Sequence, residues 1–429
     1  MKLQPKDHRV HSFLSRHLRA PVYRFDLITD PRARRGRRWS LSTLLWTVLS
    51  GMMAGCRTLR QVEDLTDERL KQARPVYPLP VQPGRVPDST LSELIPRLSV
   101  EELRAQQRWQ VKTLWRGKCL APFGLPCGVA TVDGKGMGAL DHDADGSAQK
   151  GRRSHDGKAY WLGRTLRAVL TSAQAKPALD QMAIPADTNE MGAFPAFFAA
   201  LLGAYAALFE IVTVDAGMTS KHNADLVHAA LKGYVMALKG TQPELLAEAM
   251  RLLLPKTLGV PCAQTPWERA QGRLIRRSLY RTSEIAGYNG WSHLRQAWLV
   301  RQESLKDGVL TIEDRSFLTN LTTGRLSPMQ CLQVVRGHWG IENDCFWSLD
   351  AQFGEDFLPW MSTGRSVEIL GLFRLLAYNL RQLGRKRHLR PRPLPSKPWP
   401  PPPSWQQMFR WVAQAYRLAD PLCGPMPAD

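Results

Sequence analysis

The chain has 429 residues, enough at about 100–200 residues per domain for two or three units with sizeable cores. Hydrophobic residues make up 44% of it, which excludes wholesale disorder. Its 58 Lys and Arg outnumber 38 Asp and Glu and leave a net charge of +20, above the magnitude of about 2–8 typical of a small domain. Such an excess favours a polyanionic partner, most simply nucleic acid, over a merely soluble basic surface.

The cysteines and the apolar segments bear on the compartment. The seven cysteines are scattered and form no C-x-x-C pair, so we expect reduced thiols rather than a disulfide framework or a structural zinc site. The first 20 residues lack the apolar run of a signal peptide. Two apolar stretches, residues 41–56 and 192–209, are better explained as buried helices than as membrane spans. The sequence therefore predicts a cytoplasmic protein without membrane association.

Residues 1–100 are predicted to form a helical N-terminal domain. An arginine run at residues 31–40 precedes an apolar helix at 41–55, with Ser40 or Ser42 as its cap, and shorter helices follow at 58–73 and from residue 88. Short helices behind an arginine run favour a small DNA-binding module, with a helical cap on the next domain as the alternative. The run's expected phosphate contacts are Arg34, Arg35, Arg37 and Arg38.

Residues 101–244 show a different pattern. Short apolar runs predict strands at residues 128–134, 160–173, 177–184, 211–217 and 234–240, with helices at 190–209 and 222–232. This order predicts an α/β fold with a mixed sheet. A basic, strand-rich insertion is expected over residues 245–326, and the α/β unit resumes with long helices over 327–385. Residues 386–429 form a basic, Pro-rich tail.

Two aspartates follow predicted strands of this sheet. Asp133 closes the run GVATVD and Asp215 closes IVTVD, each with the same parity as the residues two and four before it. Strand ends are where α/β sheets place their functional sites. Asp followed by Gly is also common at turns, so each aspartate taken alone indicates a turn as readily as a ligand.

A glutamate lies on the helix predicted to begin at Ser327-Pro328, where Ser is a favoured cap and Pro a favoured first residue. Glu342 fills the missing step of an apolar stripe at three- and four-residue spacing, and His338 lies one turn earlier on the same face. A buried acid must be paired, protonated or bound to a metal, and pairing with Arg336 is the structural alternative. The residues of the stripe are Leu332, Val335, Trp339, Phe346 and Leu349.

Together, Asp133, Asp215 and Glu342 make a plausible three-carboxylate site for Mg²⁺. Hard divalent cations prefer oxygen ligands, and a pair of such ions can activate a nucleophile and stabilise a leaving oxygen at a phosphodiester. In a chain of charge +20, DNA or RNA is the expected phosphodiester.

These residues lie in blocks that resemble bacterial insertion-sequence transposases of the DDE type, in the ISAs-type branch whose glutamate block is His-Trp-x-Ile-Glu-Asn. In this sequence that block is His338-Trp339-Gly340-Ile341-Glu342-Asn343, and the acidic blocks are Val132-Asp133-Gly134-Lys135 and Thr213-Val214-Asp215-Ala216. The N-terminal Asp30-Pro31-Arg32 and the later Ser89-Thr90-Leu91 are also similar to the family's pattern. The blocks occur in the family's order over about residues 25–385, and their combination is far more specific than any one of them.

The resemblance implies an RNase H-like core interrupted by a β-rich insertion before the glutamate helix. It also implies Mg²⁺-dependent cutting and joining of double-stranded DNA, with Mn²⁺ as a possible substitute, two ions, and Asp133, Asp215 and Glu342 as ligands. The DNA would be the element's terminal inverted repeats and a target, bound by a homodimer in the bacterial nucleoid. Further DNA contacts are predicted from Lys135, Arg273, Trp291, Arg336, His338 and Asn343. By analogy with relatives that form DNA hairpins, Trp291 could stack on a base from a loop, whereas Trp298 belongs to a strand core. The alternative for Trp291, which the sequence favours somewhat, is packing against the insertion's own sheet.

The chain departs from the wider superfamily in two places. Val335, His338 and Leu349 occupy positions that carry Tyr, Arg and Lys elsewhere, and the insertion has Gln271-Gly272-Arg273 and then Ile275 in place of His-Gly-Arg and an acid. Two alternatives therefore stay open: a transposase-derived DNA-binding protein without activity, and a metal-dependent nuclease that does not join strands.

Overall fold

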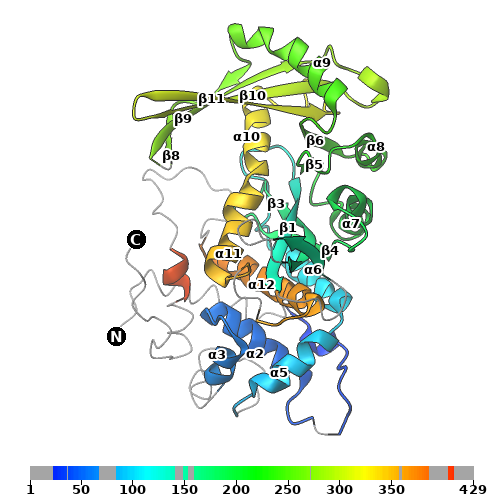
Figure 1. Ribbon diagram of the computed structural model, residues 1–429, viewed down its shortest axis with the longest axis vertical. Helices are drawn as coiled ribbons and strands as arrows, with labels where there is room; N and C mark the ends of the chain where they lie inside the picture. The colour runs from blue at the N-terminus through cyan, green and yellow to red at the C-terminus, as the bar shows by residue number, and fades with distance from the viewer. Residues whose placement is uncertain are drawn as a thin grey trace.

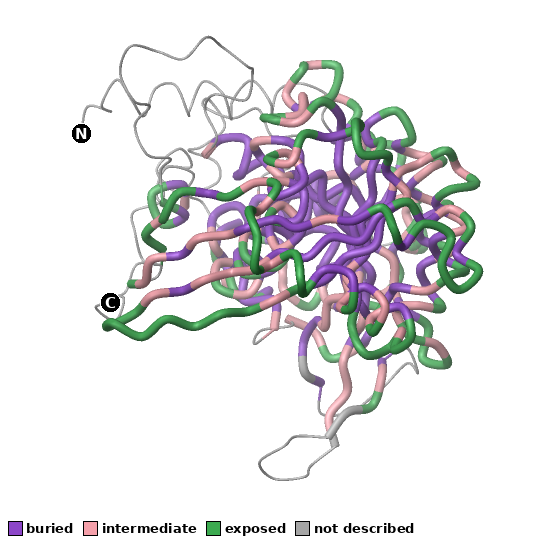
Figure 2. Tube along the Cα trace, turned by 90° about the horizontal axis from the view of Figure 1, so that it is seen from above, coloured by how far each residue is buried: buried purple, intermediate pink, exposed green. Residues whose placement is uncertain are grey.

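The computed structural model describes residues 23–35, 37–66, 84–140, 148–152, 159–270, 272–356, 360–385 and 404–409. N-terminal helices lie at one end of the molecule, a sheet runs through its middle, and a strand-rich region lies at the other end (Figure 1). Buried residues are concentrated in the centre and are surrounded by partly and fully exposed segments (Figure 2). None of the described helices is long and apolar enough to cross a membrane.

The N-terminal region is helical, as predicted. The Ser40 hydroxyl accepts a hydrogen bond from the Thr43 amide at 3.1 Å and caps the apolar helix α2. α2 shares one hydrophobic core with the long helix α12 (Gly364–Arg385), so the region packs as a helical cap on the α/β unit. Its elements are η1 (Phe25–Leu27), α2 (Leu41–Ala54), α3 (Leu59–Leu65), α5 (Asp88–Leu94), η2 (Ile95–Arg97) and α6 (Val100–Arg116).

All described strands belong to one mixed sheet with the order β2-β3-β1-β5-β6-β11-β10-β9-β7, with β4 paired to β3 and β8 to β9. The first part consists of β1 (Val129–Leu140), β2 (Gln149–Arg152), β3 (Ala159–Leu170), β4 (Ala178–Ala183), β5 (Ile211–Val214) and β6 (Gly233–Leu238). β1 is antiparallel to β3 and parallel to β5, and β5 is parallel to β6. The predicted mixed α/β sheet is confirmed.

The strands of the insertion extend this same sheet. β11 pairs with β6 in an antiparallel register that joins Ser316 to Leu238 and Thr319 to Val235. The region opens with a helix, α9 (Pro243–Leu253), and the turn η3 (Pro255–Leu258), which the strand-rich prediction did not include. Its strands are β7 (Ala263–Gln264), β8 (Glu268–Ala270), β9 (Arg273–Thr282), β10 (Gln296–Lys306) and β11 (Val309–Thr319), with η4 (Tyr288–Gly290) between β9 and β10.

The two faces of the sheet carry different helices. Because side chains alternate along a strand, Val132 and Val214 face one core, which α7 (Glu190–Tyr205), α8 (Lys221–Ala229) and α9 complete. Val129 and Ile211 face the opposite core, completed by α10 (Pro328–His338). After α10 the chain continues through the π-helix η5 (Ile341–Phe346) into α11 (Trp347–Phe353). Asp133 and Asp215 have the parity of the α10 face.

Candidate active site

Asp133 and Asp215 follow equivalent positions on neighbouring parallel strands. The register aligns Val132 of β1 with Val214 of β5, so the two aspartates come next on both strands. β5 ends at Val214, directly before Asp215 and earlier than the predicted 211–217, whereas β1 continues to Leu140, so the expectation that Asp133 closes its strand was wrong. The antiparallel partner β3 supplies hydrogen bonds to the glycine-rich stretch that the sequence suggested was a turn. At Asp133, therefore, β1 is still paired with the antiparallel strand β3 but no longer with the parallel strand β5.

Glu342 reaches the same face of the sheet from the helix side. Ser327 and Gln330 form a capping box at the start of α10, which confirms the predicted helix start. The prediction that Glu342 belongs to a buried stripe was wrong, because its side chain is exposed. The π-helix η5 changes the rotation per residue, so that Ile341 and Cys345 take the buried positions and Glu342 faces solvent.

Burial and neighbouring acids together raise the pKa of Asp133 to about 8. Burial is the largest cause, since Asp133 is only 8% exposed, and the negative charges of Asp215, Glu342 and Glu190 add to it. The Gly134 amide, which donates to Asp133 Oδ1 at 2.8 Å, acts in the opposite direction. A cation among these carboxylates would relieve both the burial and the repulsion of the Asp133 charge.

The described residues contain no group of three or more His, Cys, Asp or Glu side chains arranged closely enough to be a ready-made metal cage. The donor set nevertheless fits the ions that the sequence predicts, since carboxylate oxygens are the preferred ligands of Mg²⁺ and Mn²⁺. Asp215 is further oriented by the Met218 amide, which donates to its Oδ1 at 3.2 Å.

Glu190, at the start of α7, is a fourth acid that the sequence analysis missed. A Cβ placed on Gly134 would lie 2.0 Å from Glu190 Oε1, and one placed on Gly217 would lie 3.4 Å from Glu190 Oε2. Gly134 and Gly217 therefore leave the space that the Glu190 carboxylate occupies. Arg164 donates to Glu190 Oε1 at 2.8 Å from β3. The available signal was the pair of glycines that follow Asp133 and Asp215, which the sequence analysis explained only as turn residues.

Beside Glu342 lies a groove of about 790 Å³ between the glutamate helix and the insertion strands. Three predicted DNA contacts, Arg273, Arg336 and Asn343, line it. The wall also carries Trp339 and Trp347, of which Trp347 is 55% exposed. The basic residues of the groove are Lys176, Arg273, Arg277, Arg315 and Arg336.

The guanidinium groups of this groove outnumber its acids. Burial and the positive charges of Arg336, Arg315 and Arg273 lower the pKa of Arg277. Its buried Nε has no hydrogen-bond partner among the described residues. Arg336 pairs with Glu268 at 2.7 Å, and the Arg315 guanidinium lies 4.4 Å from the centroid of the Trp339 ring. The surface is therefore suited to a polyanion.

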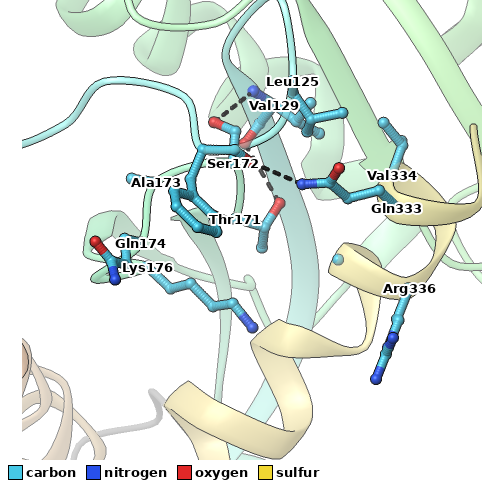
Figure 3. Close-up of a pocket in the computed structure, with 12 residues that line it drawn as sticks. Leu125, Val129, Thr171, Ser172, Ala173, Gln174, Lys176, Gln333, Val334 and Arg336 are labelled. Atoms are coloured by element: carbon cyan, nitrogen blue, oxygen red, sulfur yellow. Dashed lines mark hydrogen bonds between the residues drawn. The ribbon is translucent and has the colours of Figure 1, made fainter. Parts of the chain in front are cut away.

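A smaller cavity of about 360 Å³ adjoins the groove between the end of β3 and α10 and shares Lys176 and Arg336 with it (Figure 3). Thr171 and Ser172 form part of its β3 side, and Gln333 contributes from α10. Lys176 also pairs with Asp344, two residues after Glu342.

Two predicted contacts, Trp291 and Lys135, lie outside this groove. Trp291 is 4% exposed and packs in the core with Ile285 and Leu294, so the packed alternative holds and the suggestion of a free ring was wrong. The short turn η4 folds the Trp291 indole inward, and Trp298, as predicted, is also core. The Lys135 ammonium is bound by Asp350 and Asp356, each at 2.7 Å.

The remaining candidates divide between core and surface. His338 is buried and hydrogen bonded to Thr213, which places it beneath the acids rather than at a phosphate. Of the superfamily departures, Val335, Leu349 and Ile275 are buried, and Gln271 lies outside the described residues. The four predicted phosphate contacts of the N-terminal run are exposed: Arg34, Arg35, Arg37 and Arg38.

The strand order, the paired aspartates and the facing glutamate helix define a mixed α/β fold with a group of acidic side chains at one end of its parallel strands. Sequence comparison matches residues 128–380 to the family described as Transposase DDE domain and residues 22–109 to the one described as DDE_Tnp_1-associated. The chain therefore belongs to the DDE transposase family. Among solved structures, a piggyBac transposase synaptic complex with hairpin DNA aligns with 99% of this chain and 80% of that chain, at 12% identity and a TM-score of 0.37. No curated protein matches the sequence.

Proposed function

We propose that this chain cleaves double-stranded DNA at the ends of an insertion sequence and joins those ends to target DNA, with Asp133, Asp215 and Glu342 as ligands of Mg²⁺. The main support is that Asp133 and Asp215 come next after aligned residues of two neighbouring strands, on the face of the sheet that the glutamate helix covers. When bound, divalent ions at such a site activate a nucleophilic oxygen and stabilise the leaving one. The protein's own carboxylates would bind and orient those ions.

The arginine groove gives the proposal a place for DNA. Its guanidinium groups lie beside Glu342, so a phosphate backbone bound there would pass close to the acids. Arg277 and Arg315 join the predicted Arg273 and Arg336 as phosphate contacts, and Trp347 offers an exposed indole for stacking on a base.

The N-terminal arginines would form a second contact region. Arg34 and Arg35 are exposed on the segment that precedes α2, where they are accessible to a phosphate backbone. Arg37 is partly held by the backbone carbonyls of Ala33 and Asp30, and Arg38 stacks on Trp39. The helices after them would help to recognise the element's ends, as the sequence analysis expects.

The test is a strand-transfer assay on DNA that carries the sequences flanking the protein's own gene. Asp133→Asn, Asp215→Asn and Glu342→Gln should each abolish Mg²⁺-dependent cleavage and leave DNA binding largely intact, because the amide cannot replace the lost charge. Asp225→Asn, an exposed acid paired with Lys221 on α8, is the matched control and should cleave normally.

Each outcome is distinct. Normal cleavage by one of the three variants removes that residue from the site. DNA binding by the wild type without cleavage supports an inactive transposase-derived protein, and cleavage without joined products supports a nuclease. For the groove, Arg277→Gln and Arg315→Gln should each lower the log-log salt slope of DNA binding by about one.

A further inference from the structure

Four buried side chains form a continuous line of hydrogen bonds beneath the three acids. The hydroxyls of Thr171 and Thr131 are 2.8 Å apart, and those of Thr131 and Thr213 are also 2.8 Å apart. Thr213 Oγ1 then lies 3.1 Å from Nδ1 of His338. None of the four side chains is more than 8% exposed, so water does not compete freely for these bonds.

Three of these four residues lie two or four positions before one of the three acids in the sequence. Thr131 lies two residues before Asp133 on β1, and Thr213 lies two residues before Asp215 just inside the end of β5. Residues two apart on a strand share a face, so each threonine lies on the same side of the sheet as its aspartate. His338 is the last residue of α10, four positions before Glu342. The line therefore joins the three elements that carry the acids.

The direction of the hydrogen bonds follows from the far end of the line. Thr171 donates its only hydroxyl hydrogen to the carbonyl oxygen of Val129 at 3.3 Å (Figure 3), so it accepts from Thr131. Thr131 has then used its hydrogen and accepts from Thr213. Thr213 in turn accepts from His338, which must carry a hydrogen on Nδ1. Burial favours the neutral imidazole and lowers the pKa of His338 to about 4, so Nε2 is the bare nitrogen.

We propose that His338, as the Nδ1–H tautomer, is a positioning residue that fixes the glutamate helix against β5 and β1 through Thr213 and Thr131. This role rests on the proposed function of Asp133, Asp215 and Glu342. Ile341 and Cys345 anchor the π-helical turn by burial, but the Glu342 side chain is exposed, so its own burial does not set its distance from the aspartates. The tether at His338 limits how far the turn can rotate.

Nitrogen NMR of the full-length protein labelled with ¹⁵N-histidine tests the tautomer without any catalysis. The signal that His338→Gln removes should show a protonated Nδ1 and an unprotonated Nε2. Thr213→Val, which keeps the shape but removes the acceptor, should change that signal, and Thr213→Ser should restore it. A protonated Nε2 in the wild type, or a signal that Thr213→Val does not alter, would overturn the proposal.

The positioning role has its own measurement. Thr213→Val should reduce the cleavage rate at saturating DNA on the order of 10- to 100-fold, because small misplacements of reacting groups carry penalties of that size. Its DNA affinity should be unchanged, and Thr213→Ser should recover most of the rate. Thr311→Val, which removes a hydroxyl bonded to Ser304 on the β10–β11 hairpin, is the control.

Equal rates for Thr213→Val and Thr311→Val would show that the line of hydrogen bonds is structural only. If the wild type cleaves no DNA at all, the proposed function fails, while the NMR result still decides the tautomer and the bond to Thr213. The two failures are therefore distinguishable.

Discussion

Arg167 and Glu355 form a two-point ion pair in which neither side chain is exposed to solvent. Arg167 Nη1 and Nη2 lie 2.6 and 2.9 Å from the two carboxylate oxygens of Glu355. Arg167 lies opposite Asp133 in the β1–β3 register, and Glu355 follows α11. The pair thus connects the strand beside an acidic residue of the site to the end of the segment that carries Glu342.

Breaking this pair should destabilise the protein strongly. Arg167→Met leaves the Glu355 carboxylate buried without its partner, so the free energy of unfolding should fall by about 3–5 kcal/mol in urea denaturation. Arg251→Met, in the exposed Arg251–Glu248 pair on α9, should leave it nearly unchanged. Similar stability of the two variants would contradict a structural role for the buried pair.

The raised pKa of Asp133 makes the stability of the metal-free protein depend on pH. The folded protein keeps a proton on Asp133 up to about pH 8, whereas the unfolded chain releases it near the usual 3.8. The folded state therefore binds more protons in this window, and stability falls as the pH rises from about 4 to about 8. Melting temperatures in EDTA should show this decline, less steeply in Asp133→Asn than in the wild type or Asp225→Asn. A slope that Asp133→Asn leaves unchanged would assign the effect to other groups.

Glu190→Gln should weaken the binding of divalent cations without unfolding the protein. The substitution keeps the shape of the side chain at the start of α7 but removes a negative charge close to Asp133 and Asp215. Titration calorimetry with Mn²⁺ should show a several-fold lower affinity. Glu244→Gln, at the start of α9, is the matched control. Wild-type affinity in Glu190→Gln would mean that this carboxylate serves only its bond to Arg164.

Two tryptophans should respond in opposite ways. Trp291→Ala removes a buried ring from the core and should lower the free energy of unfolding by about 3–5 kcal/mol. Trp347→Ala removes a ring that is 55% exposed in the groove, so it should spare stability and reduce affinity for single-stranded or distorted DNA ends. Thermal melting and fluorescence anisotropy check both. A DNA-binding defect in a stable Trp291→Ala protein would reverse this assignment.

Local signals in the sequence were enough to predict much of the fold. Ser40 and Ser327 cap the helices that they were expected to cap, because capping depends only on a few neighbouring residues. The aspartates were found because each follows an apolar run, and the sequence displays that change of polarity directly even though β1 continues past Asp133. The β-segments around residues 273–319 were also recognisable by composition.

The missed features depend on tertiary structure. Glu342 faces solvent instead of the predicted buried stripe because a π-helix alters the rotation per residue. The spacing of an ideal α-helix cannot predict this change. Trp291 is buried because it packs into the core with residues of other elements, and Glu190 comes close to the acids because Gly134 has no side chain to occupy that space. Arg277 and Arg315 lie on different strands, β9 and β11, and Arg336 lies on α10. Their distance in the sequence therefore gives no sign that they are close in the structure.

The continuity of the sheet also fixes the angle at which DNA could meet the protein. Neighbouring strands rotate by roughly 20–25° relative to each other, and five steps lead from β1 through β5, β6, β11 and β10 to β9. At that rotation the expected twist from the strand of Asp133 is roughly 60–75° at β11 and roughly 100–125° at β9, and Figure 1 shows β10 and β11 running across the direction of β1. One twisted sheet thus carries both the acids, on β1 and after β5, and the arginines of the groove, on β9 and β11. A straight DNA duplex aligned with the strands at the acids would therefore cross the strands at the groove.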